Sequence, residues 1–287
     1  MVFKMRINVH AHGSHAERNK DGKLVLPLML AWRPEHCSPA QFIKQHHSLG
    51  VEKLFLLDSP EIAFEYKRIF GDFIIPIPGV DMDKCVPADI EALFTRGARG
   101  IKFIGPLHSY GDSRYFPLYD VIRKHRGLAM FHTGFLAVEI FNPGGLHARN
   151  DYLDITHMRP AAIDRVARAF PDLKILMAHF GNPWWEETWT VLKSHKNVYA
   201  ELSGGTAKTR SMVMWQRIFA PGGKLHAESA SKLCFGTDGS SFAPDHYKDL
   251  KRMTDFYERL YEALRLPEEI RRKIDRENAI VLADTGA

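Results

Sequence analysis

The chain alternates between short apolar runs of strand composition and stretches with helical periodicity. The apolar runs cover residues 5–9, 53–57, 73–77, 100–104, 128–131, 174–178, 198–202 and 233–235. Between them, apolar side chains return every three or four positions, as at Ile163, Val166, Ala167 and Phe170, which puts one apolar stripe on each helix. The pattern therefore predicts a strand followed by a helix, repeated eight times.

Helix boundary signals agree with this alternation. Ser38-Pro39 opens the segment that ends at Gly50, and Arg159-Pro160 opens the segment that ends near Pro171. Strands that alternate with helices form parallel sheets, and eight such units favour a closed (β/α)8 barrel, the TIM barrel, over an open doubly wound sheet. No Gly-x-Gly-x-x-Gly follows any of these runs, so a dinucleotide-binding fold loses its main support. We expect an α/β fold with a single barrel domain over residues 1–287.

Two loops depart from the repeated unit. Residues 14–35 follow the first predicted strand and residues 135–157 follow the fifth, so both loops emerge where barrel active sites lie. They are either lids that contact the substrate or surface insertions. Residues 249–266 have apolar side chains at helical spacing and are predicted to form the last outer helix, before a short helix that ends near Leu282.

Composition narrows the choice of partners and compartment. The net charge of +5 results from 39 basic and 34 acidic residues mixed along the chain, so a nucleic-acid partner is not expected, whereas a small anionic substrate is compatible. No apolar stretch reaches the roughly 18 residues of a membrane span, and the start of the chain lacks a signal-peptide pattern, so we predict a cytoplasmic protein. Three cysteines, Cys37, Cys85 and Cys234, are too few and too far apart for a disulfide framework or a CxxC metal site.

Two histidines follow the first predicted strand in the segment Asn8-Val9-His10-Ala11-His12. Side chains two apart on a strand point to the same side, so both imidazoles are expected to face the barrel mouth. Neutral imidazoles are ligands for Zn2+, Fe2+ and Mn2+. Because histidine pairs also occur in loops and cores, this pair alone does not establish a metal site.

Further metal-ligand types stand at the ends of other predicted strands. His132 follows the fifth strand, His179 the sixth, and Asp238 the eighth. In a barrel all of these strand ends meet on one face, so residues far apart in sequence surround one point. Any one of these residues could be a buried polar residue whose hydrogen bonds are made within the core. This alternative does not explain why such residues follow several strands at once.

With these motifs the sequence resembles the amidohydrolase superfamily, and within it the amidohydrolase-related branch that includes the aminocarboxymuconate-semialdehyde decarboxylase-like enzymes. The resemblance extends from His10 to the segment Glu277-Asn278-Ala279. It implies an enzyme with a divalent ion, Zn2+ first and Mn2+ or Fe2+ otherwise, bound by His10, His12, His132 and Asp238. It also implies that His179 either joins a second ion or hydrogen-bonds the metal-bound water. The alternative for His179 is a structural histidine in the barrel wall.

The implied roles are consistent with the chemistry of these side chains. A bound divalent ion lowers the pKa of its water to about 7 and polarises a substrate carbonyl. Asp238 would accept a proton and later deliver it to a leaving group, and His179 would stabilise the developing oxyanion. Lys102 ends the fourth strand, where some superfamily members have a CO2-modified lysine that bridges two ions. An unmodified lysine that contacts an anionic substrate is the simpler alternative.

Candidates for the substrate wall come from the neighbouring loops. They are Trp184, Tyr110 and Arg149, with Trp185, His108 and Phe135 as further members. Aromatic residues in such loops also serve as packing residues, and that alternative stays open. Glu201, at the end of the seventh strand, is expected either to hydrogen-bond a ligand histidine or to form a salt bridge at the strand end.

Three functions are compatible with these residues. The leading hypothesis is a hydrolase that cleaves an amide C–N or lactone C–O bond of a small substrate, with Asp238 moving the proton. The alternative is a non-oxidative decarboxylase of a small carboxylic acid. Such relatives usually read the carboxylate with a loop arginine, and neither Arg149 nor Arg33 lies in a recognised motif, which favours hydrolysis. The third hypothesis is a non-catalytic barrel that binds a ligand. The presence of all the metal-binding residues of the family argues against it. A homo-oligomer is compatible with the aromatic residues of the outer helices.

Overall fold

Parallel strands and helices alternate along the chain, as the sequence pattern predicts. The computed structural model describes residues 5–13, 17–18, 24–25, 38–135, 154–204, 207–240 and 246–286. The strands of the barrel wall are β1 (Arg6–His12), β4 (Val51–Leu56), β5 (Ile74–Pro76), β6 (Gly79–Val80), β7 (Gly100–Phe103), β8 (Leu128–His132), β9 (Lys174–Ala178), β10 (Val198–Glu201), β11 (Leu233–Cys234) and β12 (Gly239–Ser240). Each of the eight predicted strand segments overlaps one of them. A short antiparallel pair, β2 (Glu17–Arg18) and β3 (Leu24–Val25), follows β1.

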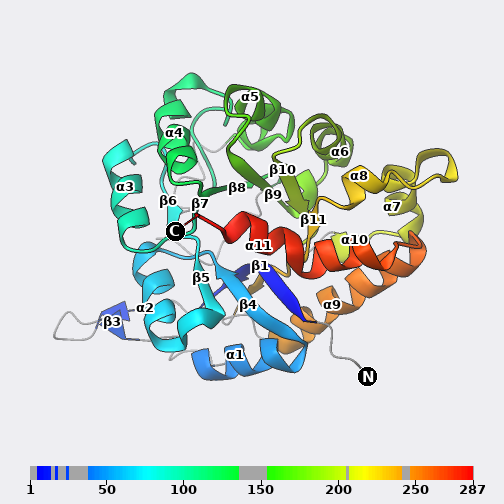
Figure 1. The fold of residues 1–287 in the computed structure, drawn as a ribbon, viewed down its shortest axis with the longest axis horizontal. Helices are drawn as coiled ribbons and strands as arrows, with labels where there is room; N and C mark the ends of the chain where they lie inside the picture. The colour runs from blue at the N-terminus through cyan, green and yellow to red at the C-terminus, as the bar shows by residue number, and fades with distance from the viewer. Residues whose placement is uncertain are drawn as a thin grey trace.

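The helices lie outside the strands and surround them (Figure 1). They are α1 (Pro39–Ser48), α2 (Pro60–Phe70), α3 (Pro87–Thr95), α4 (Phe116–Lys124), α5 (Ala161–Ala169), α6 (Trp185–Ser194), α7 (Met212–Phe219), α8 (Ala227–Ala230), α9 (His246–Ala263), α10 (Glu268–Arg272) and α11 (Asn278–Ala283). Two of them begin at sequence-encoded caps, because the Ser38 and Ser59 side chains accept hydrogen bonds from backbone N–H groups and a proline starts each helix. The predicted last outer helix is α9, which begins slightly earlier, at His246.

Two groups of parallel strands make up the barrel wall. One has the order β12-β1-β4-β5 and the other the order β11-β10-β9-β8-β7-β6. Backbone hydrogen bonds join the groups on both sides. Gly79 N donates to Asp58 O (2.8 Å) and Arg99 N to Pro76 O (3.0 Å) on one side, and Val9 N donates to Phe235 O (2.9 Å) on the other. The wall is therefore continuous around its axis, in agreement with the predicted (β/α)8 barrel.

Apolar side chains fill two layers, one inside the wall and one outside it. The inner layer includes Val9, Met130 and the free thiol Cys234, and Leu282 of α11 packs against it. The outer layer lies between strands and helices and includes the fully buried Trp215. Burial of each large apolar side chain contributes about 1.5–3 kcal/mol, so these layers hold the strands in register.

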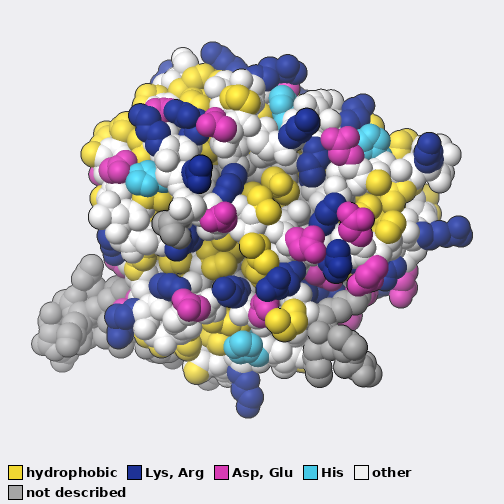
Figure 2. All heavy atoms as spheres, in the orientation of Figure 1, with side chains coloured by type: hydrophobic (Ala, Val, Ile, Leu, Met, Phe, Trp, Pro, Cys, Tyr) yellow, Lys and Arg dark blue, Asp and Glu magenta, His cyan; other side chains and the backbone are white. Residues whose placement is uncertain are grey.

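The helix α11 covers the amino-terminal end of the barrel. It crosses in front of the strands in Figure 1, and Lys174, the first residue of β9, donates a hydrogen bond to the Asp284 carbonyl just after it. Figure 2 shows the same face, where charges of both signs are interspersed and hydrophobic side chains gather near the centre. Ile280 and Val281 of α11 are 42% and 50% exposed. The opposite end of the barrel is where the predicted site residues lie.

No helix among the described residues is long and apolar enough to cross a membrane.

The hydroxyl of Tyr257, on α9, joins two neighbouring strands just before the barrel mouth. It donates to Cys234 O (2.8 Å) and accepts from Leu202 N (3.1 Å) and Gly236 N (3.2 Å). The two N–H groups belong to the residues that lead from β10 and β11 toward the site. One buried hydroxyl therefore satisfies backbone groups where regular strand pairing ends.

The replacement Tyr257→Phe removes this hydroxyl and leaves buried N–H groups without it. We expect the free energy of unfolding to fall by about 2–4 kcal/mol, because each unsatisfied buried polar group costs about 1–3 kcal/mol. Urea unfolding followed by circular dichroism measures the loss. The control Tyr247→Phe, at a tyrosine that is 42% exposed, should change stability by less than about 0.5 kcal/mol. Equal losses in both variants would contradict the role of the Tyr257 hydroxyl.

Candidate metal centre

His10 and His12 reach the barrel mouth from an irregularity in β1. Asn8 pairs with Leu54 and Ala11 pairs with Leu56, so three residues of β1 lie opposite two residues of β4. This bulge interrupts the alternation of inward and outward side chains. His10 therefore faces the mouth, although Val9, its neighbour, packs in the inner apolar layer. His10 is 1% exposed and the side chain of His12 is 27% exposed.

The side-chain amide of Asn8 fixes the end of β1 against the last strand. Asn8 is fully buried, its Nδ2 donates to Thr237 Oγ1 (2.8 Å), and its Oδ1 accepts from His10 N and Thr237 N (both 3.1 Å). Asp238 N in turn donates to His10 O (2.9 Å). These hydrogen bonds hold His10 and Asp238, which are far apart in sequence, at adjacent positions of the mouth.

Four imidazoles and one carboxylate meet at this point. Asp238 Oδ1 lies 3.2 Å from His10 Nε2 and 3.3 Å from His12 Nε2, and these two ring nitrogens are 3.3 Å apart. His179 Nε2 lies 3.1 Å from His132 Nδ1. Ligand atoms of His10, His179 and Asp238 all lie within 4.8 Å of one another, which joins the two sets. The structure therefore brings together all five residues that the sequence predicts for the centre.

Hydrogen bonds on the outer ring nitrogens direct the inner ones toward a common centre. His10 Nδ1 donates to Glu201 Oε1 (2.9 Å), His179 Nδ1 lies 3.3 Å from Ser203 O, and His132 Nε2 lies 3.4 Å from Phe135 O. Since a neutral imidazole has one N–H, the other nitrogen of each ring presents a lone pair. Lone pairs that face each other at 3.1–3.3 Å repel unless a proton or cation lies between them. The donor set therefore fits a divalent metal ion.

The charges around the centre also favour a bound cation. Burial alone would lower the pKa of His12, but hydrogen bonds to Asp238 and Asp58 raise it to about 10, so a proton is held between His12 and these carboxylates. Burial, together with Lys102, lowers the pKa of His10 to about 4. Burial would raise the pKa of Glu201, but His10 and its other partners lower it to about 2. Glu201 thus stays ionised against a neutral His10.

Backbone strain marks two residues of the centre. His179 has φ +60° and Asp238 has φ +54°, which lie in the left-handed region that residues other than glycine seldom adopt. Such conformations persist only where surrounding contacts fix them, and they cluster at functional sites. The space is tight as well, since a Cβ at Gly204 would lie 2.9 Å from His179 Nδ1.

Lys102 approaches the centre from inside the wall. Its neighbours Ile101 and Phe103 pack in the outer layer, so Lys102 points into the barrel. It is 4% exposed, and Nζ has no hydrogen-bond partner among the residues described. Burial lowers the pKa of Lys102 to about 8, although Glu201 and Asp238 act in the opposite direction. The ammonium is thus desolvated and close to the carboxylates without being bonded to them.

The residues predicted for the substrate wall have different positions. Tyr110 is fully buried, and its hydroxyl bonds to His132 O (3.0 Å) and Phe103 O (3.3 Å), so it supports His132 from behind; the expectation that it lines the wall does not agree with this burial. Trp184 lies under the Arg159 guanidinium (5.2 Å) at the start of α6. Arg149 lies outside the described residues, as do most of the loops 14–35 and 135–157.

Several residues of the centre were not assigned a role from the sequence. Asn8 lies two residues before His10, and Thr237 directly precedes Asp238. This closeness to predicted ligands is the sequence feature that could have identified them. Ser203, two residues after Glu201, gives no sequence signal that separates it from other serines. Glu201 was predicted to bond either a histidine or a cation, and the structure shows the bond to His10.

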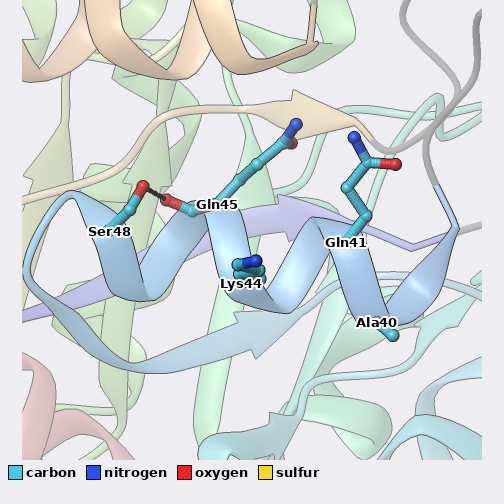
Figure 3. A pocket seen from close by; sticks show the side chains of 5 residues that line it. All are labelled: Ala40, Gln41, Lys44, Gln45 and Ser48. Carbon is cyan, nitrogen blue, oxygen red and sulfur yellow. Dashed lines mark hydrogen bonds between the residues drawn. The ribbon is translucent and has the colours of Figure 1, made fainter.

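A hollow on the outer face of α1 is not part of this centre. Its lining consists of Ala40, Gln41, Lys44, Gln45 and Ser48, all from one helix, and the Ser48 hydroxyl donates to the Gln45 carbonyl at 2.7 Å (Figure 3). None of these side chains is a histidine or a carboxylate. The chemistry of the molecule therefore points to the barrel mouth and not to this hollow.

An α/β barrel with histidines and an aspartate at its strand ends defines a class of metal-dependent barrel enzymes. The sequence matches the family model described as Amidohydrolase over residues 7–282, and the chain therefore belongs to the amidohydrolase family of enzymes, as its resemblance implied. No curated protein sequence matches the chain.

Solved structures with the same fold agree with this assignment. The barrel is similar to a TIM-barrel protein from Bordetella bronchiseptica (TM-score 0.65, 20% identity, 87% of this chain and 84% of that chain). It is also similar to 2,6-dihydroxybenzoate decarboxylase from Rhizobium (0.62, 15%, 99% and 100%). A third is 5-carboxyvanillate decarboxylase from Novosphingobium aromaticivorans (0.58, 11%, 97% of each chain). At these identities the likeness establishes the shared fold.

The first prediction of this geometry concerns metal content. We expect elemental analysis of the purified protein, after supplementation with Zn2+ or Mn2+, to find about one or two ions per chain, because five donors converge. The double replacement of His10 and His12 by Ala should remove bound metal while circular dichroism stays unchanged. The control is replacement of His125 and His195, histidines of the outer helical layer, by Ala. Metal retained in the His10 and His12 double variant would disprove the site.

A second prediction concerns His46, which contacts the Asn8 amide from α1. Asn8 Nδ2 lies 3.2 Å from His46 Nε2, and His46 Nδ1 donates to Phe42 O (2.9 Å). Burial and the neighbouring His246 ring lower the pKa of His46 to about 3. Between pH 3 and the unfolded value of about 6.5, the unfolded chain binds more protons, so stability falls as pH decreases through this window.

Chemical unfolding at several pH values measures this effect. His46 contributes a slope of up to about 1.4 kcal/mol per pH unit to the free energy of unfolding. In His46→Gln that contribution disappears, so the curve between pH 4 and 6 should become flatter. His47→Gln changes an exposed residue of the same helix and should keep the original slope. Identical slopes for both variants would show that His46 is not held neutral.

Proposed function

We propose that the protein catalyses the non-oxidative decarboxylation of a small carboxylic acid, with a divalent ion held by His10, His12, His132 and Asp238. The observation that supports this best is Lys102, whose buried ammonium has no hydrogen-bond partner within the described part of the chain. A buried cation without a partner costs free energy, and a carboxylate bound beside it would offset that cost. Two similar structures are named as decarboxylases, which agrees with the proposal.

The donors and one similar structure guide the choice of ions to test. Imidazole and carboxylate donors suit Zn2+ and Mn2+, and the 5-carboxyvanillate decarboxylase was solved with bound manganese and a substituted benzoic acid. When bound, such an ion supplies positive charge that polarises a substrate oxygen. Zn2+ and Mn2+ are therefore the first ions to test.

Decarboxylation needs one proton for each CO2 released. The bond between carbon and carboxylate breaks, its electron pair stays on the carbon, and that carbon takes up a proton. We assign the delivery of this proton to Asp238, whose carboxylate lies at the mouth with its side chain 32% exposed and so exchanges protons with solvent. His179 would accept a hydrogen bond from a substrate hydroxyl, because its Nε2 lone pair faces the centre.

Hydrolysis of an amide or lactone, the leading hypothesis from the sequence, is the second candidate. Asp238 as a base would serve it equally well, whereas His179 would need a proton on Nε2 to stabilise an oxyanion. Lys102 separates the two candidates, since a neutral amide or lactone offers no anion to a buried ammonium. The similar structures also support decarboxylation better than hydrolysis.

The experiment is a CO2-release assay of the metal-loaded protein with hydroxylated benzoic acids, in parallel with amide and lactone substrates. We expect turnover of an acid, abolished in Asp238→Asn with the fold intact. Lys102→Met should raise KM for that acid by about 10–100-fold, which corresponds to a charge-assisted hydrogen bond of about 1.5–3 kcal/mol.

The matched control is Lys196→Met, at an exposed lysine between α6 and β10, which should keep the original KM. Turnover of lactones or amides without CO2 release from any acid would favour hydrolysis and contradict the proposal. Near-normal turnover in Asp238→Asn would contradict the role of that carboxylate in either reaction.

A further inference from the structure

Two polar residues at the end of β10 lie directly behind the histidines of the centre. Glu201 is fully buried and Ser203 is 2% exposed. Glu201 Oε1 lies 2.9 Å from His10 Nδ1 and 3.0 Å from the backbone N of His179. Ser203 Oγ lies 3.2 Å from His10 Nδ1 and 3.3 Å from His179 Nδ1. The pair therefore touches two imidazoles that come from different strands.

The directions of these hydrogen bonds follow from the donors that are present. An ionised carboxylate only accepts, so Glu201 receives His10 Nδ1–H, His179 N–H, and both the N–H and the hydroxyl of Ser203, the last at 2.8 Å. The hydroxyl proton of Ser203 is thereby used. Its oxygen has lone pairs left, and the group that reaches them on the far side is His179 Nδ1–H.

The backbone approaches Glu201 and His179 closely at two glycines. A Cβ at Gly236 would lie 2.7 Å from Glu201 Oε2, and a Cβ at Gly204 would lie 2.9 Å from His179 Nδ1. Both positions therefore need glycine while Glu201 and His179 keep their places. Two glycines from different segments thus constrain the same arrangement.

We propose that Glu201 and Ser203 are one positioning unit that fixes the ring tautomers of two histidines: Glu201 holds His10 with Nδ1 protonated, and the Ser203 hydroxyl holds His179 in the same form. Both rings then present Nε2 to the centre. The two residues divide the task, so Glu201 acts on the affinity for the ion and Ser203 acts on the histidine that faces the substrate. This inference does not depend on which reaction the protein catalyses.

The first test uses full-length, Zn2+-loaded protein with 15N-labelled histidine. NMR spectra that correlate ring protons with ring nitrogens report which nitrogen of each imidazole is protonated. In the native protein we expect His179 in the Nδ1–H form. In Ser203→Ala we expect the His179 signal to shift toward the Nε2–H form, while Ser203→Thr, which keeps a hydroxyl, restores the native form.

The matched control for this test is Ser229→Ala, because Ser229 is also fully buried and its hydroxyl has no hydrogen-bond partner among the described residues. It should leave the His179 signals unchanged. The Ser203 carbonyl also lies 3.3 Å from His179 Nδ1. An unchanged Nδ1–H form in Ser203→Ala would show that this carbonyl suffices, and it would overturn the role of the hydroxyl.

The second test measures ion affinity by competition with a chelator. Loss of the hydrogen-bond partner of a ligand histidine typically weakens metal binding about 10–100-fold, and we expect this for Glu201→Gln. Ser203→Ala should stay within about threefold of the native affinity. If an assay for turnover is established, Ser203→Ala should lower kcat with little change in KM.

The control for the carboxylate is Asp275→Asn, which changes a buried carboxylate that bonds Arg6 and Tyr261 outside the barrel wall. It should lower thermal stability without weakening ion binding, so it separates a general loss of stability from a loss of positioning. Equal ion affinities of Glu201→Gln and the native protein would overturn the proposal. A failure of the decarboxylation assay would not, because NMR and chelator competition need no substrate.

Discussion

The hydrogen bonds of the buried Asn8 amide are the interaction on which the rest of the centre depends. Sheet closure requires the last strand to meet the first in one register, and a slip of one residue would turn each side chain to the opposite face. Asn8 prevents this, because its oxygen accepts from His10 N and Thr237 N and its nitrogen donates to Thr237 Oγ1. Each of these groups is buried, so loss of the amide would leave several polar atoms unsatisfied. The same bonds that close the barrel therefore place His10 beside Asp238.

A second constraint is the balance of charge at the mouth. With neutral imidazoles, the carboxylates of Glu201, Asp238 and Asp58 face one ammonium, that of Lys102, which leaves two formal negative charges. A divalent ion neutralises this excess. Without the ion, a proton on His12 neutralises part of this charge, and the pKa of His12 is accordingly raised to about 10. The pKa of His10, which is more deeply buried, is lowered to about 4. Binding of an ion at His12 would therefore release this proton.

The strands and the residues that gather at the barrel mouth could be predicted from the sequence because both depend on local pattern. Apolar runs of strand length separated by helical periodicity identify the wall, and His10, His12, His132, His179 and Asp238 each follow such a run. The closing hydrogen bonds were not all predictable, since some of them use residues beyond the predicted strands, such as Asp58 and Gly79. The position of Tyr110 could not be predicted either. An aromatic residue after a strand suits both a wall and a core, and only its hydrogen bond to His132 O decides for the core.

The sequence indicates the roles of Lys102 and Ser203 only in part. That Lys102 points inward follows from its alternation with Ile101 and Phe103. That its Nζ lacks a hydrogen-bond partner among the described residues depends on the folded surroundings, which the local sequence does not show. Ser203 becomes informative only when Glu201 and His179 are seen around it.

The strained backbone at His179 and Asp238 connects stability with function. Each left-handed residue costs of the order of 1–3 kcal/mol, and it persists because buried hydrogen bonds hold it: those from Glu201 for His179 and those of the Asn8 network for Asp238. Both holding groups come from the barrel wall and not from the long loops. The positions of His179 and Asp238 are thus fixed by groups of the barrel wall.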